Sequence, residues 1–124
     1  MLRVAFFAAL AAMPFAAPVP AQDREEAAPG SGAVLRALDK VNGKTVDITA
    51  ATGETVTMFG LDVFMVECRY PARNPTGDAW AFLVVRETGA RDIRFQGWMI
   101  ASSPALNALD HARYDVWLLR CNTA

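Results

Sequence analysis

The chain has 124 residues, of which 53% are hydrophobic and 20% are charged, and its formal net charge is −1. This length suits one domain with a modest core. Acidic and basic residues are mixed without a basic block, so the sequence indicates neither nucleic-acid binding nor a polybasic membrane contact.

Residues 1–21 have the three parts of a secretory signal peptide. Arg3 supplies the positive start, residues 4–12 are an apolar run, and residues 19–21 (Val-Pro-Ala) precede a predicted cleavage at Gln22. The run is shorter than the ~20 apolar residues that cross a bilayer. We therefore expect export to the periplasm, with no transmembrane segment after cleavage. An uncleaved anchor is the alternative.

Cys68 and Cys121 are the two cysteines of the chain. An even count in an exported protein favours a disulfide. A metal site would need more ligands than two cysteines and the single His111 readily supply, and a redox pair would usually have the Cys-x-x-Cys spacing. The sequence thus predicts a structural disulfide that holds the last strand.

The segments after the signal peptide divide into two parts. Residues 22–32 are polar and rich in turn formers, which predicts a disordered lead-in. Residues 33–124 are predicted to form a single β domain, a small β-sandwich or barrel-like fold of six to seven strands with one short helix near residues 103–109. The expected strands cover residues 33–39, 45–49, 54–59, 61–69, 79–87, 92–99 and 114–121.

Local patterns refine this expectation. Asn42-Gly43 between the first two strands is a hairpin signal. Simple alternation places Cys68 opposite the side of its strand that carries Leu61, Val63 and Met65, and it places Cys121 opposite the side that carries Val116 and Leu118. The strand at residues 61–69 is apolar on both sides, which predicts a central strand covered on both faces.

The expected helix begins at Ser102-Ser103-Pro104. A serine hydroxyl would cap the first free amides, and proline suits the first helical position. Leu106 and Leu109 would then face the sheet.

Residues of a hydrolase triad occur near the C-terminus: His111 with Ser102 or Ser103 and a nearby aspartate. The signal is weak, because the chain has no Gly-x-Ser-x-Gly elbow and capping already explains the serines. His111 is interpreted as an exposed turn residue. Asp62 and Glu67 are five positions apart on one strand and therefore face opposite sides, so no glycosidase pair is indicated. No catalytic residue, metal site or cofactor is predicted.

A binding surface is the other candidate. Trp80, Trp98 and Trp117 are three tryptophans in one small domain, and aromatic side chains either fill cores or anchor interfaces. We predict a possible binding surface that includes Trp80, Trp98 and Arg73, the last within the irregular segment 70–78. Exposed tryptophans would also suit a carbohydrate-binding module.

Several segments resemble one bacterial family, DUF2155, whose members are small exported domains. The most specific is FQGWMIASSPALNALDHARYDVWLLRC at residues 95–121; residues 35–44, Phe59-Gly60 and Cys68-Arg69 add to the likeness. The resemblance implies a small, exported, mainly β domain with a Cys68–Cys121 bond and without a known cofactor or substrate. It also implies a partner at the outer face of the inner membrane, such as a respiratory complex.

These observations favour a non-enzymatic periplasmic accessory or binding domain that contacts an envelope protein or membrane complex. The alternatives are a small envelope hydrolase that uses His111 with Ser102 or Ser103, and a carbohydrate-binding module. The oligomeric state is left open.

Overall fold

The computed structural model describes residues 11–18 and 26–123. Residues 11–18 are irregular and exposed. The rest of the predicted signal peptide and residues 22–25 of the predicted lead-in lie outside the described residues. Within the described ranges, no helix is long and apolar enough to cross a membrane.

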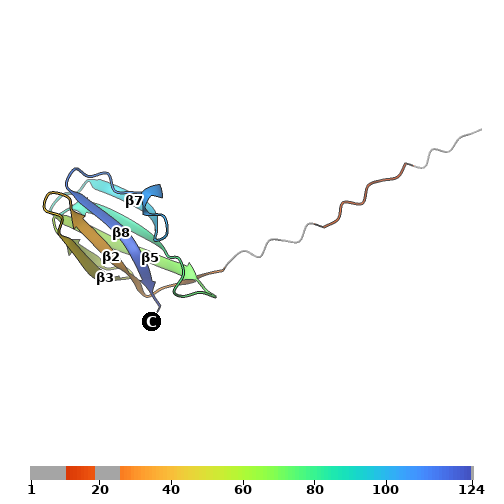
Figure 1. The fold of residues 1–124 in the computed structure, drawn as a ribbon, viewed down its shortest axis with the longest axis horizontal. Coiled ribbons are helices and arrows are strands. Elements are labelled where there is room, and N and C mark those ends of the chain that lie inside the picture. The colour runs from red at the N-terminus through yellow and green to blue at the C-terminus, as the bar shows by residue number, and fades with distance from the viewer. Residues whose placement is uncertain (1–10, 19–25, 124) are drawn as a thin grey trace, which may run out of the picture.

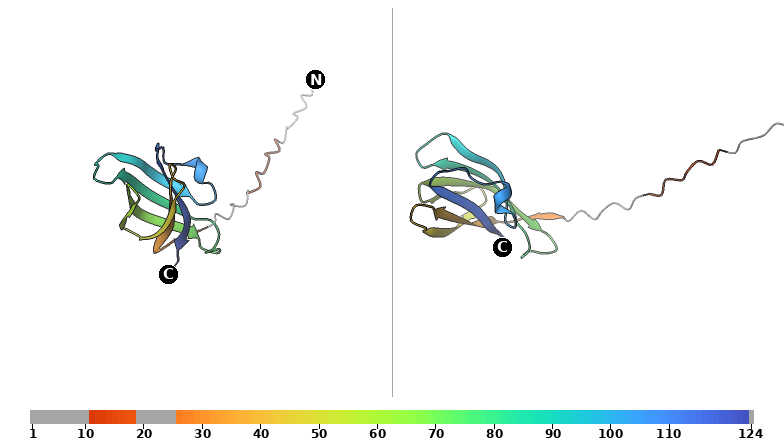
Figure 2. Two further views of the ribbon diagram at one scale, coloured as in Figure 1. Left: turned by 60° about the vertical axis from the view of Figure 1, so that its left-hand side comes forward. Right: turned by 45° about the horizontal axis from the view of Figure 1, so that its top comes forward.

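Eight strands form two antiparallel sheets that pack face to face as a small β-sandwich (Figures 1 and 2). The larger sheet has the order β1-β5-β6-β7, with β4 also paired to β5, and the smaller sheet has the order β3-β2-β8. The strands are β1 (Ala27–Pro29), β2 (Gly32–Asp39), β3 (Thr45–Ala51), β4 (Thr55–Met58), β5 (Leu61–Pro71), β6 (Trp80–Glu87), β7 (Ile93–Ile100) and β8 (Tyr114–Asn122). The mainly β sandwich prediction is confirmed, and the sheets of the described chain do not close into a barrel.

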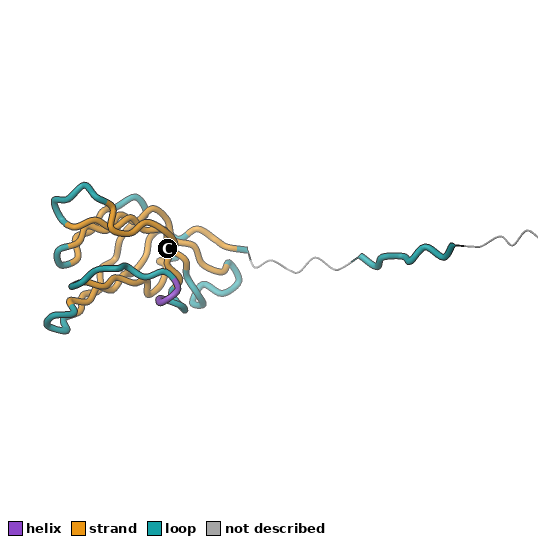
Figure 3. The backbone as a smooth tube through the Cα atoms, turned by 90° about the horizontal axis from the view of Figure 1, so that it is seen from above, coloured by secondary structure: helices purple, strands orange, loops and turns teal. Residues whose placement is uncertain are grey.

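The core lies between the two layers, which Figure 3 shows from above. Alternate residues of each strand point inward because side chains of a strand alternate between its faces. The larger buried side chains are Leu35, Met58, Leu61, Val63, Met65, Leu83, Val85, Met99, Val116 and Leu118. The alternating apolar pattern of the sequence therefore specified most of the core.

The β2–β3 hairpin turns at Asn42-Gly43, as predicted. Gly43 has a φ of 73°, a value that glycine adopts without steric cost. The carboxylate of Asp39 accepts hydrogen bonds from the amide of Val41 and the side chain of Asn42, which stabilises the turn locally.

The predicted disordered lead-in is wrong for its last residues. Ala27–Pro29 form β1, which pairs with the end of β5 in the register Ala27↔Pro71. The amide of Gly30 then donates to the carbonyl of Cys68 at 2.7 Å. Composition could not reveal this strand, because its backbone bonds to β5 are long-range and independent of side-chain pattern. It is one reason that eight strands form instead of six or seven.

Two β-bulges overturn the strand faces predicted by simple alternation. In β5 the pairing with β6 shifts between Met65 and Glu67, and in β8 the pairing with β2 shifts so that Leu118 and Arg120 oppose consecutive residues. A bulge inserts one extra residue and reverses the face of everything that follows it. Cys68 and Cys121 therefore both turn into the core, where they are buried.

A disulfide between Cys68 and Cys121 links the two sheets, with 5.7 Å between the Cα atoms. It joins β5, a central strand of the larger sheet, to the C-terminal end of β8 in the smaller sheet. Without both bulges, each thiol would face away from the other sheet. The bond fixes the last strand to the rest of the sandwich.

The same β5 bulge corrects the expectation for two carboxylates. Asp62 pairs with Arg86 and Glu67 pairs with Phe82, and both partners lie on the outward side of β6. Asp62 and Glu67 consequently share the outer face of the sheet. β5 is central, but its outer face is only partly buried, so it is not covered on both faces as predicted.

The predicted helix near residues 103–109 is a single 3₁₀ turn, Pro104–Leu106. Ser103 occupies the N-cap position, but its side chain makes no capping hydrogen bond. Ser102 is held elsewhere, because its hydroxyl donates to Asp78 Oδ2 at 2.7 Å. Leu106 points outward with 75% of its surface exposed, whereas Leu109 is buried as expected.

Candidate functional site

The outer face of the larger sheet carries an apolar row. In β6 the buried residues Ala81, Leu83 and Val85 point inward, so the intervening side chains point away from the other sheet. Cross-strand partners share a face, which places β5 and β7 residues beside them. We call this row the outer aromatic face; its members are Phe64, Trp80, Phe82, Val84, Trp98 and Ile100.

Trp98 is the most exposed member of the outer aromatic face. It retains 39% of its surface exposed and stands edge-on to Phe82, with ring centroids 5.4 Å apart and planes at 79°. Trp80 is half-buried. It lies diagonally across the β6–β7 pair from Trp98, because Trp80 pairs with Ile100 while Phe82 pairs with Trp98. An exposed indole held by a neighbouring ring is already ordered, so it loses little conformational freedom on binding.

The backbone beneath Trp98 is also fixed. Asn107 Nδ2 donates to the Trp98 carbonyl at 2.7 Å, which ties the segment after β7 to its edge. The ring therefore rests on a rigid strand, the kind of support that precise recognition requires.

Polar side chains border this face. Glu67 and Arg69 flank Phe82 and Trp80 on β5 and form an ion pair of 3.3 Å. Gln96 lies beside Val84 on β7 and is exposed. An apolar centre with a polar border is the usual anatomy of a protein interface.

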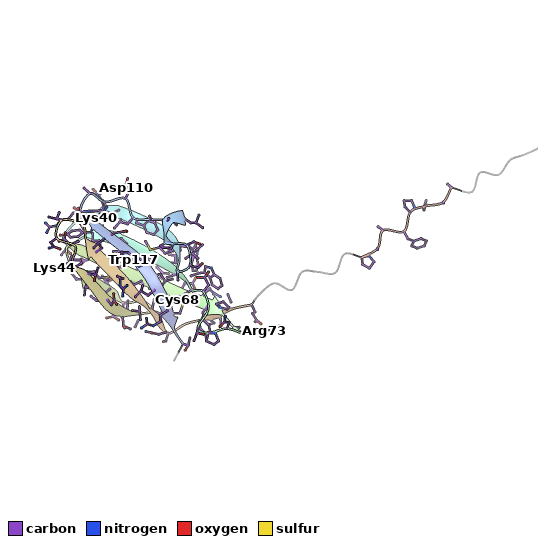
Figure 4. The ribbon with its side chains drawn as sticks, in the orientation of Figure 1. Lys40, Lys44, Cys68, Arg73, Asp110 and Trp117 are labelled. Carbon is purple, nitrogen blue, oxygen red and sulfur yellow. A yellow bond between two sulfur atoms is a disulfide. The ribbon has the colours of Figure 1, made fainter. Side chains whose placement is uncertain are left out.

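The other predicted surface residues lie apart from this row. Arg73 is exposed in the loop between β5 and β6, beyond the strands that carry Trp80; Figure 4 shows it at one end of the sandwich. Trp117 is on β8 in the smaller sheet, where with Pro104 and Ala108 it lines a hollow of about 370 Å³. The predicted group of Trp80, Trp98 and Arg73 is thus only partly brought together.

The one histidine of the chain, His111, follows Asp110 at the opposite end of the sandwich, where Figure 4 labels Lys40, Lys44 and Asp110. The prediction of an exposed turn histidine is wrong, because His111 is buried with 8% of its surface exposed. Its Nε2 lies 2.8 Å from Glu87 Oε1. Its Nδ1 accepts hydrogen bonds from the amides of Arg113 at 3.0 Å and Tyr114 at 3.1 Å.

This pattern assigns the His111 proton to Nε2, because Nδ1 faces two donors. The hydrogen bond from His111, with a further contribution from Arg94, outweighs desolvation and lowers the pKa of Glu87. Lys40 Nζ donates to the His111 carbonyl at 2.6 Å. Both ring nitrogens and the carbonyl of His111 are thus occupied in holding the segment before β8 to the ends of β2 and β6.

An ion pair reinforces the same end. Asp39, 3% exposed, bonds Arg113 at 2.9 Å. Hydrogen bonds from Arg113 and the turn amides outweigh desolvation and lower the pKa of Asp39. Arg113 also lies over the Tyr114 ring at 5.3 Å. These contacts join the β2–β3 turn to the start of β8.

The residues of the proposed triad are not brought together. Ser102 bonds Asp78, and within residues 26–123 no serine is a hydrogen-bond partner of His111. Burial raises the pKa of Asp78, but hydrogen bonds from Ser102 and backbone amides more than offset it and lower the pKa overall. In the part of the chain that the structure describes, no three His, Cys, Asp or Glu side chains are grouped to hold a metal ion.

Comparison with known proteins identifies the family. A family model described as an uncharacterized protein conserved in bacteria, DUF2155, matches residues 33–121. The chain belongs to the DUF2155 family. No curated protein and no solved structure matches the chain.

In this DUF2155 domain, sequence reasoning singled out Trp80 and Trp98 but missed Phe82 and Phe64 between and beside them. The signal was present: in Trp-Ala-Phe-Leu-Val the aromatic residues are two apart and therefore share a face. The cluster around His111 had no comparable signal, because Asp39, Glu87 and Arg113 are far apart in the chain.

Proposed function

We propose that this DUF2155 domain is a non-enzymatic binding module of the periplasm that docks to an envelope or inner-membrane protein through the outer aromatic face. The observation that carries the proposal is the exposed Trp98, held edge-on by Phe82 on the outward side of a rigid sheet. Tryptophan is among the residues most enriched at the energetic centres of interfaces.

Three further features support this proposal. The inter-sheet disulfide suits an oxidising compartment outside the cytoplasm. The ring nitrogens of His111 are both bonded to neighbouring groups of the domain, which argues for a structural histidine. The outer aromatic face is bordered by charged and amide side chains that suit the rim of a protein contact. A respiratory complex of the inner membrane is one assembly to which such a module would bind.

Site-specific photo-crosslinking in intact cells tests the proposal. A crosslinking amino acid is placed at Gln96, beside the outer aromatic face, and as a matched control at Arg120, on the outer side of the smaller sheet. We expect one envelope protein to be captured from Gln96, to be lost when Trp98→Ala is added, and not to be captured from Arg120. Equal capture from both positions, or capture unaffected by Trp98→Ala, would contradict the proposed face.

A carbohydrate-binding module is the second candidate, and the same exposed indole favours it. Sugar rings stack on aromatic faces, and Glu67, Arg69 and Gln96 could bond their hydroxyls. Titration of purified protein with soluble envelope glycan fragments, followed by tryptophan fluorescence, distinguishes the two. A saturable change that Trp98→Ala abolishes would favour the glycan over the protein partner.

A further inference from the structure

The edges of the two sheets differ in how their outward backbone groups are satisfied. An edge strand presents a row of free N–H and C=O groups, which natural proteins usually cover. In this sandwich the edges are formed by β7 and the short β1 and β4 in the larger sheet, and by β3 and β8 in the smaller sheet.

The edges of β7 and β8 are capped in part by neighbouring groups of the same chain. On β7, the carbonyls of Trp98 and Ile100 accept hydrogen bonds from Asn107 and Ser103. On β8, the amide of Tyr114 is bonded to His111 and the amide of Val116 to Asp115. A bulge beside Arg94 further interrupts the edge of β7.

The edge of β3 is left open over its central residues. Two backbone hydrogen bonds mark the ends of the β2–β3 ladder. At one end the amide of Asp39 donates to the carbonyl of Lys44, and at the other the amide of Thr52 donates to the carbonyl of Ser31. Because bonded pairs recur every second residue in an antiparallel ladder, Thr45, Asp47 and Thr49 direct their backbone groups away from β2. Within the described chain none of these three amides or carbonyls has a hydrogen bond.

One end of β3 is already closed. The amide of Ala51 donates to Glu54 Oε2 at 2.9 Å, and the carbonyl of Ala51 accepts from the amide of Glu54 at 3.0 Å. The β2–β3 register contains no bulge. What remains is a regular edge, uninterrupted by a bulge and centred on the middle of the strand.

We propose that this edge pairs with β3 of a second copy of the chain, antiparallel and about a two-fold axis at Ile48. Ile48 is the midpoint of Thr45–Ala51, so this register overlaps the strands over their full length. It sets Asp47 opposite Thr49 of the second copy and forms four new backbone hydrogen bonds. The two smaller sheets become one continuous six-stranded sheet.

The charges of the strand select this register. An axis at Asp47 would place two carboxylates directly opposite, which is unfavourable. With the axis at Ile48, each Asp47 stays paired with Arg36 of its own chain, at 2.7 and 2.8 Å. On the inner side, Val46 and Ile48 are partly buried against the core, and Ile48 of the second copy would cover the exposed part of its counterpart.

The mass of the purified full chain, measured by analytical ultracentrifugation over a concentration series, is the first test. We expect a concentration-dependent dimer. Thr49→Pro removes an outward N–H while leaving every β2–β3 bond, as edge prolines do, and it should give a monomer. Thr55→Pro, at a corresponding outward position of β4, is the matched control and should leave the dimer unchanged.

Crosslinking supplies a test that does not depend on proline tolerance. Ile48→Cys places two thiols directly opposite across the axis, about 5 Å apart at Cβ, so a disulfide-linked dimer should form with the native bond intact. Val46→Cys should remain unlinked, because its opposite residue is Ala50. The proposal is overturned by a parent that is monomeric at every concentration, by a dimer that survives Thr49→Pro, or by an Ile48→Cys protein that stays unlinked.

Discussion

Removing the inter-sheet disulfide should cost this domain a large part of its stability. Cys68 and Cys121 are 53 residues apart in sequence, and closing a loop of that length reduces the entropy of the unfolded chain by an amount worth about 4 kcal/mol. For a domain of this size, that corresponds to a fall in Tm of about 15–30 °C. The bond also holds the end of β8, the last strand of the smaller sheet.

The assay is thermal unfolding followed by circular dichroism, for the parent with and without reductant and for the double variant Cys68→Ala, Cys121→Ala. Reduced parent and double variant should both melt far below the oxidised parent. Their difference from each other measures the packing lost with the two sulfur atoms. A change in Tm of less than about 5 °C on reduction would refute the loop-closure argument for this fold.

Three further predictions concern polar contacts. The pKa of Asp39 is lowered in the folded state. Its ionised form therefore stabilises the fold above the unfolded-state pKa of about 4, and this stabilisation is lost as the pH falls below that value. Asp39→Asn should flatten the dependence of the free energy of unfolding on pH between about pH 5 and 2 in acid titrations. His111→Ala leaves two backbone amides without their acceptor and should cost about 2 kcal/mol in urea unfolding, with a negligible loss contradicting its structural role. Ser102→Ala should cost about 1 kcal/mol through the lost bond to Asp78, whereas Ser103→Ala should change stability by less than about 0.5 kcal/mol; the reverse order would restore the helix-cap prediction.

The strands and turns of this domain were largely predictable because their signals are local. Asn42-Gly43 marks a turn whatever surrounds it, and alternation placed Leu61, Val63 and Met65 on one face of their strand, which the structure shows to be the inward one. The inward direction of Cys68 was not predictable. It depends on one unpaired residue, Val66, and nothing in the sequence marks that position as a bulge.

The candidate site likewise has features that could be predicted from the sequence and features that could not. Trp80 and Trp98 were identified by residue type, but their common face follows only from the register between β6 and β7. The burial of His111 depends on Glu87, 24 residues earlier, and on backbone amides that any residue would supply. The helix at Pro104 failed because Ser102 and Asn107, on either side, are bonded to other parts of the fold.

The central claim is tested most directly by the affinity of the purified domain for the envelope protein that photo-crosslinking identifies as its partner. Trp98→Ala should weaken binding by about 30-fold, the loss of about 2 kcal/mol that a central interface tryptophan carries. Leu106→Ala removes an even more exposed apolar side chain, but one outside the outer aromatic face, and it should leave affinity unchanged. Equal affinities for the two variants would contradict the assignment of this face as the docking surface.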